Sequence, residues 1–421
     1  MAAPYRRCQL CLERQYGEGS DVPRLPGVGP QVQGILLTKG LLPSQSLTLP
    51  PGAPSSGSNP SVPHRRSIQR GDFVFRPFLA RSDRIALWQL ANTLIPYGLL
   101  WALAIWCQGH APLLLPPVIA LLVLFLARCF ALMHDTGHGS LFRRPAANRI
   151  AGFLFGIVCG LPQLPWSRGH AFHHRHNGNW ELYQGPASLI STDAYRSLSP
   201  PRQRLYRWLR HPLMLAPGGF FYLVIKPRLT LLAALAGMAS HAVSSLQRSP
   251  QMSMGEVIAT YRSPHWHSLE EGLDLILNNL AVVGLWLLMG FAVGPGHFWM
   301  LYAPVMAGSA AIVLCIFFVQ HNFPDSYAHR TSGWDPLTGN LEGTSDLHLP
   351  PVLNWFSADI GCHAIHHLCA AIPNYRLRAC QRRHAHLLGQ VTRIGLADLS
   401  RCFAYILWDP ERSRLTTAPA D

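Results

Sequence analysis

Four long apolar runs constrain the fold of this chain of 421 residues more than any other feature. Each has about the ~20 residues that an α-helix needs to cross the ~30 Å hydrocarbon core of a bilayer. Only 13% of the residues are charged and 49% are hydrophobic, whereas a soluble domain averages about 25% charged residues. The sequence therefore predicts an integral membrane protein. The runs are residues 85–107, 113–133, 275–294 and 298–319.

The four runs form two pairs, because only a short turn separates the members of each pair. The turns are residues 108–112 and 294–297. Two further apolar stretches, 150–166 and 213–246, are broken by proline, glycine or basic residues. We expect both to lie in the membrane interface, with re-entry as the alternative for 150–166, and neither to span the membrane. The predicted fold is all-α: about four transmembrane helices in two hairpins, interfacial helices, and a histidine-rich cap on the cytoplasmic side.

Composition divides the chain into three parts. Residues 1–75 are rich in Pro, Gly, Ser and Arg, and we expect them to be mostly disordered. Residues 76–390 contain the apolar runs and form the predicted membrane domain. Residues 391–421 are interpreted as a basic C-terminal tail.

The formal net charge of +14 does not indicate a nucleic-acid-binding protein. The basic residues of this chain flank the apolar runs instead of forming one dense block with aromatic residues. That distribution favours contact with anionic lipid headgroups. The two hairpin turns contain no Arg or Lys, whereas the N-terminal part, residues 140–212 and the C-terminal part are rich in Arg. The positive-inside rule therefore places both termini and the histidines described next on the cytoplasmic face.

Three histidine clusters follow apolar segments, and eight of the 21 histidines of the chain lie in them. Residues spaced i, i+3 or i+4 share a side of a helix, and neutral imidazole is the commonest metal ligand in proteins. Three such clusters on one side of a membrane predict a metal site. His321 follows the last apolar run, as His134 follows the second, and is a candidate ninth ligand. The clusters are His134 and His138; His170, His173 and His174; and His363, His366 and His367.

Ligand chemistry alone leaves the metal open among Zn, Cu, Fe and Ni. The sequence has no His-Glu-x-x-His zinc protease motif, no glycine-rich dinucleotide fingerprint in a βαβ context and no P-loop. The isolated histidines, such as His348 and His384, are interpreted as surface or capping residues. Trp166 and Trp355 flank two of the clusters, and are candidates either for interface anchors or for the wall of an apolar channel.

At the three clusters the chain resembles the integral-membrane fatty acid desaturases. The motifs are HDTGHGSLF (134–142), HAFHHRHNGN (170–179) and HAIHHLCAAIPNYRL (363–377). They match the family's three histidine boxes, HxxxH, HxxHH and HxxHH, in order and in the long gap before the third. Their context is similar to the acyl-lipid delta-12/omega-6 group. The resemblance covers roughly residues 75–390, which would make the membrane domain a desaturase domain.

The resemblance implies two non-haem iron ions held by the eight box histidines, with His321 matching an extra histidine of such enzymes. It implies an O₂-dependent enzyme that takes hydrogen from two adjacent methylenes of a fatty acyl lipid and leaves a cis double bond. Electrons would come from an external donor such as ferredoxin or a b-type cytochrome. Because metal-bound histidines usually donate their second N–H to a carboxylate or carbonyl, Asp135 and Asp359 are candidates for these outer contacts.

Two alternatives remain at this point. A hydroxylase, ketolase or other oxygenase of lipids or carotenoids would use the same scaffold and boxes, since a fold does not determine a reaction. A non-catalytic metal transporter or sensor would need ionisable residues near the bilayer centre, and the centres of the four runs lack them. The sequence leaves open the position of the double bond, the acyl carrier, the electron donor and the oligomeric state.

Overall fold

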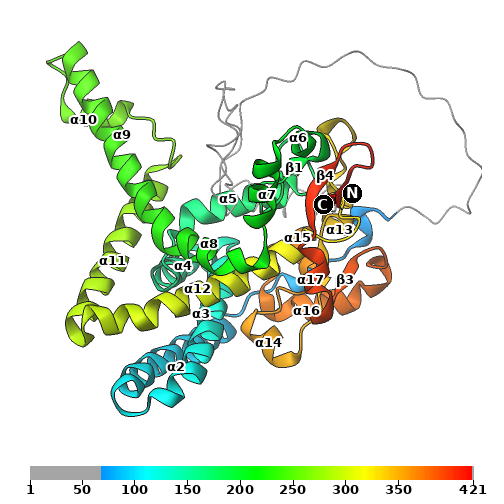
Figure 1. Ribbon diagram of the computed structural model, residues 1–421, viewed down its shortest axis with the longest axis horizontal. Coiled ribbons are helices and arrows are strands. Elements are labelled where there is room, and N and C mark those ends of the chain that lie inside the picture. Colours follow the sequence, from blue (N-terminus) through cyan, green and yellow to red (C-terminus); the bar gives the residue numbers. More distant parts are fainter. Residues whose placement is uncertain (1–67, 420–421) are drawn as a thin grey trace, which may run out of the picture.

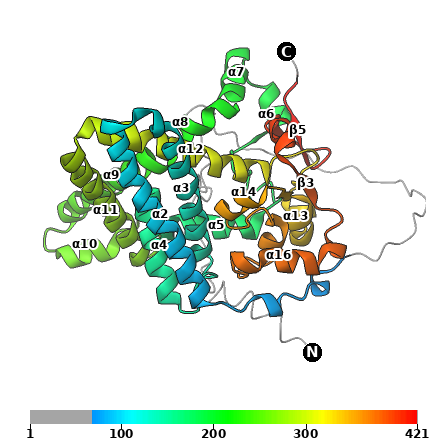
Figure 2. The ribbon, with the colours of Figure 1, turned by 90° about the horizontal axis from the view of Figure 1, so that it is seen from below.

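The computed structural model describes residues 68–419 as a mainly helical protein in which long helices lie beside a cap of short elements (Figures 1 and 2). The disorder expected for residues 1–67 lies outside the described residues. The long helices are α2 (Asp83–His110), α3 (Leu115–Gly137), α9 (Lys226–Arg248), α11 (Leu269–Val293) and α12 (Pro295–Val319).

The two predicted hairpins are confirmed as α2–α3 and α11–α12. A short turn that includes η3 (Pro112–Leu114) joins the first pair. The second turns at Gly294, whose φ of 86° favours glycine because a Cβ is strained there. Ser82 and Ser268 begin α2 and α11 by accepting backbone N–H groups, as N-cap residues do. In the centre of the bundle, α3 packs against both α2 and α12.

A fifth candidate span runs from Pro212 to Arg248, where the sequence analysis expected interfacial helices. It contains η4 (Pro212–Met214), α8 (Leu215–Phe220), the π-helical turn η5 (Phe221–Ile225) and α9. The basic residues inside it do not interrupt the helices. The Lys226 ammonium lies over the ring of Tyr222, and the Arg228 guanidinium donates to the carbonyls of Gly160 and Leu223. Figure 1 shows α9 and the short α10 (Met254–Thr260) projecting from the bundle.

Helices α4 (Pro145–Cys159) and α5 (Gln163–His176) bend by 100° at the break between them. If this pair is one span, the described residues contain up to six candidate spans, and otherwise five. The break follows Gly160, which ends α4 in the left-handed conformation with a φ of 71°. The bend agrees with the expectation that residues 150–166 do not cross the membrane as one straight helix.

The cap is built from short elements on one side of the bundle. Its α-helices are α6 (Thr192–Arg196), α7 (Pro200–Trp208), α13 (Pro336–Glu342), α14 (Pro351–Phe356), α15 (His363–Leu368), α16 (Asn374–Arg383) and α17 (Leu399–Cys402). Its 3₁₀ helices are η1 (Arg70–Asp72), η2 (Arg76–Phe78), η6 (Thr331–Gly333), η7 (Ala385–Leu387) and η8 (Leu396–Asp398).

Two small sheets hold distant parts of the cap together. Strand β1 (Ile190–Ser191) pairs in parallel with β4 (Tyr405–Asp409), which pairs antiparallel with β5 (Arg414–Thr417). Strand β2 (Ser345–Leu347) pairs in parallel with β3 (Thr392–Ile394). Each parallel pair joins the C-terminal part to an earlier segment of the chain.

The structure differs from the predicted domain boundaries at both ends. Residues 392–417 form three strands, η8 and α17, and Leu407, Trp408 and Leu415 are buried in a hydrophobic cluster, so this segment belongs to the folded cap and is not a tail. Strand β4 begins with four consecutive apolar residues, Tyr405 to Trp408, and the last three of them are buried. At the other end, Phe73 is buried against the ring of His384, so the folded body begins before residue 76.

Candidate metal centre

Nine histidines meet at the boundary between the bundle and the cap in two groups that can each hold a metal ion. Within a group, the ligand atoms lie within 4.8 Å of one another. These are the nine residues that the sequence analysis proposed as ligands. The first group is His134, His138, His170, His174 and His366; the second is His173, His321, His363 and His367.

The spacing of each box explains how its histidines divide between the two groups. On a helix, residue i+3 lies about 60° to one side of residue i, and residue i+4 lies about 40° to the other side. In all three boxes the i and i+4 residues share a group, whereas the i+3 residues, His173 and His366, reach into the opposite group. An HxxHH box can therefore serve two neighbouring metal ions.

Four segments carry the ligands. His134 lies in the last turn of α3, and His138 is its C-cap residue. The second box occupies the C-terminal half of α5, and the third forms most of α15. His321 follows the end of α12 by two residues. The ends of two membrane helices are thus brought to α5 and to the short cap helix α15.

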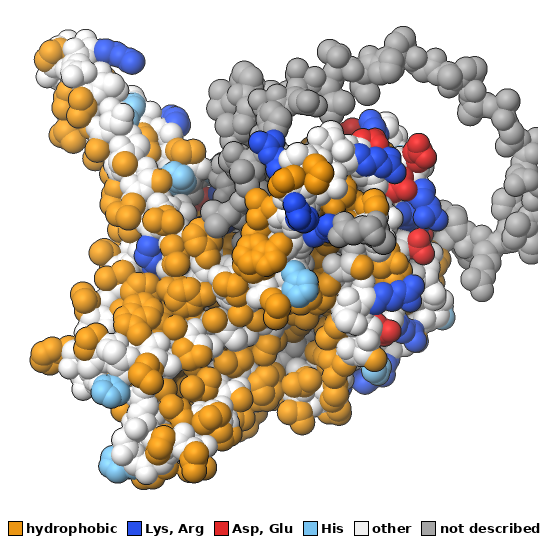
Figure 3. All heavy atoms as spheres, in the orientation of Figure 1, with side chains coloured by type: hydrophobic (Ala, Val, Ile, Leu, Met, Phe, Trp, Pro, Cys, Tyr) orange, Lys and Arg blue, Asp and Glu red, His pale blue; other side chains and the backbone are white. Residues whose placement is uncertain are grey.

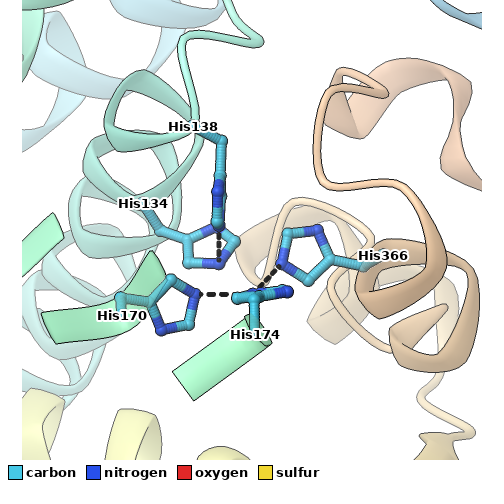
Figure 4. Close-up of side chains that lie close together, drawn as sticks. All are labelled: His134, His138, His170, His174 and His366. Carbon is cyan, nitrogen blue, oxygen red and sulfur yellow. Dashed lines mark hydrogen bonds between the residues drawn. The ribbon is translucent and has the colours of Figure 1, made fainter. Parts of the chain in front are cut away.

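The imidazole rings point their Nε2 atoms at one another (Figure 4). The Nε2 atoms of His174 and His170 are 3.0 Å apart, and those of His138 and His134 are 3.3 Å apart. In the second group, the Nε2 atoms of His363 and His321 are also 3.0 Å apart. A neutral imidazole carries one N–H and one lone pair. If the lone pairs are on the facing Nε2 atoms, a metal ion between these atoms would bind both lone pairs.

Two rings are held from behind by acceptors that favour a lone pair on Nε2. The Nδ1 of His134 lies 3.3 Å from Asp135, as the sequence analysis proposed for that carboxylate. The Nδ1 of His321 lies 3.2 Å from the carbonyl of Gly343. When Nδ1–H donates to such a partner, Nε2 is left free for a metal. The Gly343 carbonyl was not predicted, since no sequence pattern marks it.

The nine rings lie in the interior of the protein. Eight of them are buried and His174 is half-buried. Burial lowers the pKa of His321 to about 4, and burial together with the neighbouring imidazoles lowers the pKa of His363 and His367 well below the ordinary value. These rings are therefore neutral at pH 7, which is the protonation state that binds metals.

Several buried ring nitrogens have no hydrogen-bond partner in the protein. Unsatisfied buried polar atoms are costly, so such a set around the two histidine groups indicates absent partners. This observation, together with the all-imidazole donor set, fits a transition-metal ion in each group. The atoms are both ring nitrogens of His173 and His367, and the Nδ1 atoms of His174, His363 and His366.

Asp359 does not make the contact proposed for it. Its carboxylate forms an ion pair with Arg378 at 2.8 Å, and its backbone has a φ of 56°, so the chain turns there and α15 begins only at His363. The carboxylate of Asp346 supports the third box instead. It accepts the backbone N–H of Ala364 at 3.1 Å and the side-chain amide of Gln381.

Asp274 supports the second box in a similar way, and the sequence analysis did not single it out. Its carboxylate accepts the backbone N–H of Leu164 at 2.8 Å, in the first turn of α5. A carboxylate at a helix N-terminus satisfies free N–H groups and interacts favourably with the helix dipole. Its one sequence signal is an acidic residue directly before an apolar run.

Of the other side chains that the sequence analysis considered, one borders the histidine groups and three lie outside them. The ring of Trp166 stacks on His170 with centroids 4.9 Å apart, so this residue borders the histidines. Trp355 lies outside them, with the Arg128 guanidinium over its ring. The Nδ1 of His176 donates to the Phe172 carbonyl, and this ring stays outside both groups. His384, expected at the surface, is buried and accepts the backbone N–H of Val74.

An apolar cavity of about 380 Å³ lies between α3, α12, α14 and the segment 396–399, and it reaches His134. The described residues that line it are otherwise uncharged, and Ser357 is the one hydroxyl among them. Its volume and apolar lining suit a hydrocarbon chain.

The family model for fatty acid desaturases matches residues 109–394, well over half of the chain. The chain belongs to the fatty acid desaturase family. This desaturase is 28% identical over 342 residues to a fatty acid desaturase of Bacillus subtilis (strain 168), covering 81% of this chain and 88% of the relative. It is 27% identical over 390 residues to a chloroplastic omega-3 fatty acid desaturase of Glycine max, covering 88% and 75% of the two chains.

A third relative is the temperature-sensitive sn-2 acyl-lipid omega-3 desaturase (ferredoxin) of Arabidopsis thaliana. It is 25% identical over 360 residues, which cover 82% of this chain and 71% of the relative. The desaturase is therefore an enzyme of lipid metabolism in a membrane. It has a lipid substrate and an electron donor, and its histidine groups are compatible with metal binding.

Proposed function

We propose that each histidine group holds one iron ion and that the enzyme uses O₂ to introduce a cis double bond into a lipid-linked fatty acyl chain. The observation that carries this proposal is the apolar cavity that reaches His134. It offers a hydrocarbon chain a path to one member of the five-histidine group. The unpartnered ring nitrogens around both groups support the metal part of the proposal.

Iron in these groups would supply the redox chemistry that breaking an unactivated C–H bond requires. The nine imidazoles would hold it, with five donors in one group and four in the other. Asp135 and the Gly343 carbonyl orient His134 and His321 for this purpose. The carboxylates of Asp274 and Asp346 hold the starts of the helices that carry the second and third boxes.

The cavity walls bind the acyl chain and exclude water. Ala127, Phe130 and Ala131 lie on one side, one to two turns of α3 before His134. The hydroxyl of Ser357 donates to the Asn354 carbonyl at 3.1 Å, so it does not need a partner from the cavity. From Leu124 to His134 is ten residues of α3, roughly 15 Å at 1.5 Å per residue, so a long part of a chain fits beside this helix.

The proposed sidedness places the histidine boxes and both termini on the cytoplasmic face. Arg143, Arg144, Arg382 and Arg383 are exposed on the side of the cap, whereas the hairpin turns lack Arg and Lys. An external donor such as ferredoxin or a b-type cytochrome would deliver electrons from that face. The Arabidopsis relative, whose name includes ferredoxin, supports a donor of this kind.

Gas chromatography of the fatty acids of cells that express the desaturase tests the reaction. The proposal predicts a new cis-unsaturated acid that is esterified to membrane lipids. A hydroxy acid in its place would favour the oxygenase alternative, and an unchanged profile in cells with folded, iron-loaded protein would overturn the proposal.

A matched pair of variants ties the product to the metal groups. His173→Ala removes a ligand from the four-histidine group, and we expect no product and less bound iron. His176→Ala changes a histidine of the same helix that belongs to neither group, and we expect product and iron close to wild type.

A further inference from the structure

The lining of the apolar cavity changes from exposed to buried toward the histidines. Leu396 is 47% exposed, whereas Ala127 and Phe130 are buried and His134 is only 3% exposed. Leu349, Leu353 and Leu399 are partly buried and lie between these extremes. The cavity is therefore a groove that opens at the side of the molecule beside Leu396 and closes at His134.

Two short elements form the sides of the opening. Helix α14 packs against α3 and contributes Leu353 and Phe356 to the lining. Segment 396–399, which comprises η8 and the start of α17, packs beside α12 and contributes Leu396 and Leu399. The opening thus lies between α14, which follows β2, and segment 396–399, which follows β3.

Both sides of the opening are fixed to the body of the protein. The backbone N–H of His348 donates to the Ile394 carbonyl at 2.7 Å, next to the parallel β2–β3 pair. Arg128 of α3 lies under the Trp355 ring, 3.7 Å from its centroid, and donates to the Trp355 carbonyl. The stacked rings of Phe318 and Phe403 hold α17 against α12. The width of the opening is therefore set by packing.

The outer surface of these two elements is apolar where it meets the groove. Val352 and Trp355 of α14 are exposed, as is Leu396. In Figure 3 apolar side chains cover the helical bundle, and most of the charged side chains gather on the side of the strands. The exposed apolar residues of α14 and η8 continue the surface of α3 and α12, which faces hydrocarbon in a membrane protein.

We infer that the acyl chain enters sideways from the bilayer, through the opening between α14 and segment 396–399, while its headgroup stays in the membrane interface. This inference rests on the proposed function and specifies its substrate as a membrane-resident acyl lipid instead of a water-soluble acyl thioester. Leu396 and Leu399 become residues that determine which chains enter. A charged headgroup does not follow the chain, because the groove offers it no ionic or unsatisfied polar partner.

Photo-crosslinking tests the route without turnover. Full-length protein is placed in vesicles of phosphatidylcholine that contains a fraction with a diazirine on its acyl chain. After irradiation, we expect cross-links in the peptides that contain residues 311–317 and 396–399. A diazirine-bearing acyl-CoA added from the aqueous side serves as the comparison, and we expect it to label these peptides far less.

Leu399→Trp and Ser400→Trp form a matched pair on α17. Leu399 lines the groove, and the exposed Ser400 does not. We expect Leu399→Trp to lower cross-linking to residues 311–317 about tenfold, since extra bulk in a packed site opposes binding, and Ser400→Trp to leave it unchanged. Leu396→Trp is the second variant, because its exposed position tolerates a larger side chain if Leu399→Trp does not fold.

Two results would overturn the inference: equal cross-linking in folded Leu399→Trp, Leu396→Trp and Ser400→Trp proteins, or labelling of the groove by the acyl-CoA probe and not by the vesicle lipid. The same measurement on His173→Ala protein separates this inference from the proposed reaction. Labelling of the groove in His173→Ala protein, which we expect to form no product, would show that the route does not depend on the reaction. If the groove of the wild type is labelled but the wild type forms no double bond, the proposed reaction is refuted and the route is supported.

Discussion

At the scale of single residues, Asp135 connects two histidine boxes. One carboxylate oxygen lies 3.3 Å from the Nδ1 of His134, and the other accepts the backbone N–H of Asn374 at 2.9 Å. Asn374 begins α16, shortly after the third box. Asp135 therefore sets the orientation of one ligand and fixes the position of a segment that is distant in the sequence.

We expect Asp135→Asn to weaken iron binding in the five-histidine group by about 10–100-fold, the usual effect of losing an outer partner of a ligating histidine. Asp359→Asn is the matched control, because the Asp359 carboxylate pairs with Arg378. Iron retained after dialysis against a graded series of chelator concentrations measures both. Equal iron loss in the two variants would show that the contact to His134 has no part in metal binding.

The sequence predicted the ligand residues and the contact of Asp135 with His134, but not the other outer contacts. A histidine box contains ligands spaced one helical turn apart, so the sequence alone identifies His134 and His138 as a pair. The partners of Asp135 and Asp346 lie 239 and 18 residues away. Such contacts depend on tertiary structure, and for that reason Asp359, which is near a box only in sequence, was the wrong choice.

At the scale of elements, the metal centre depends on helices too short to be stable alone. Helix α15 has 6 residues and carries three ligands, whereas isolated helices shorter than about 12–15 residues are marginal in water. Its first turn is held by Asp346, whose side chain is buried. Packing and this buried carboxylate, rather than helix propensity, keep the third box in shape.

We expect Asp346→Ala to destabilise the metal-free protein by about 1–3 kcal/mol, because buried donors lose their acceptor. Asp346→Asn keeps one oxygen acceptor and is expected to recover part of this loss. Asp193→Ala, at an exposed carboxylate of α6, is expected to change stability by less than about 0.5 kcal/mol. Thermal unfolding in detergent measures all three, and an unchanged midpoint for Asp346→Ala would contradict this role.

Hydropathy predicted the two hairpins because long apolar runs and uncharged turns are properties of local sequence. It did not predict the helical continuity of residues 212–248. Lys226 and Arg228 break the apolar pattern there, yet both side chains find partners next to the helix. The short strands, of two to five residues, were also missed, since such lengths carry little pattern to indicate a strand.

At the scale of the whole molecule, the C-terminal segment is part of the folded protein. It supplies one strand to the small two-stranded sheet and two to the three-stranded one, and Leu396 and Leu399 to the apolar groove. Its basic composition suggested a tail because charge was considered without the short apolar run from Tyr405 to Trp408. Trp408 stacks on Trp180 with centroids 4.5 Å apart, joining this segment to the loop after the second box.

We expect Trp408→Ala to cost about 3–5 kcal/mol of unfolding free energy, the usual range for removing a buried tryptophan. Trp408 is 4% exposed, whereas Trp208 is 57% exposed and provides the control. Trp208→Ala is expected to unfold within a few degrees of wild type. Thermal unfolding measures both variants. If both unfold at the same midpoint temperature as the wild type, the C-terminal segment does not stabilise the fold.

The central claim is that two separate groups of imidazoles each hold one iron ion. The most direct test is the iron content per chain of purified protein, measured for wild type and for one variant in each group, His138→Ala and His321→Ala. We expect about two iron ions in the wild type and about one in each variant. An active wild type that contains a single iron ion, or zinc in place of iron, would contradict it.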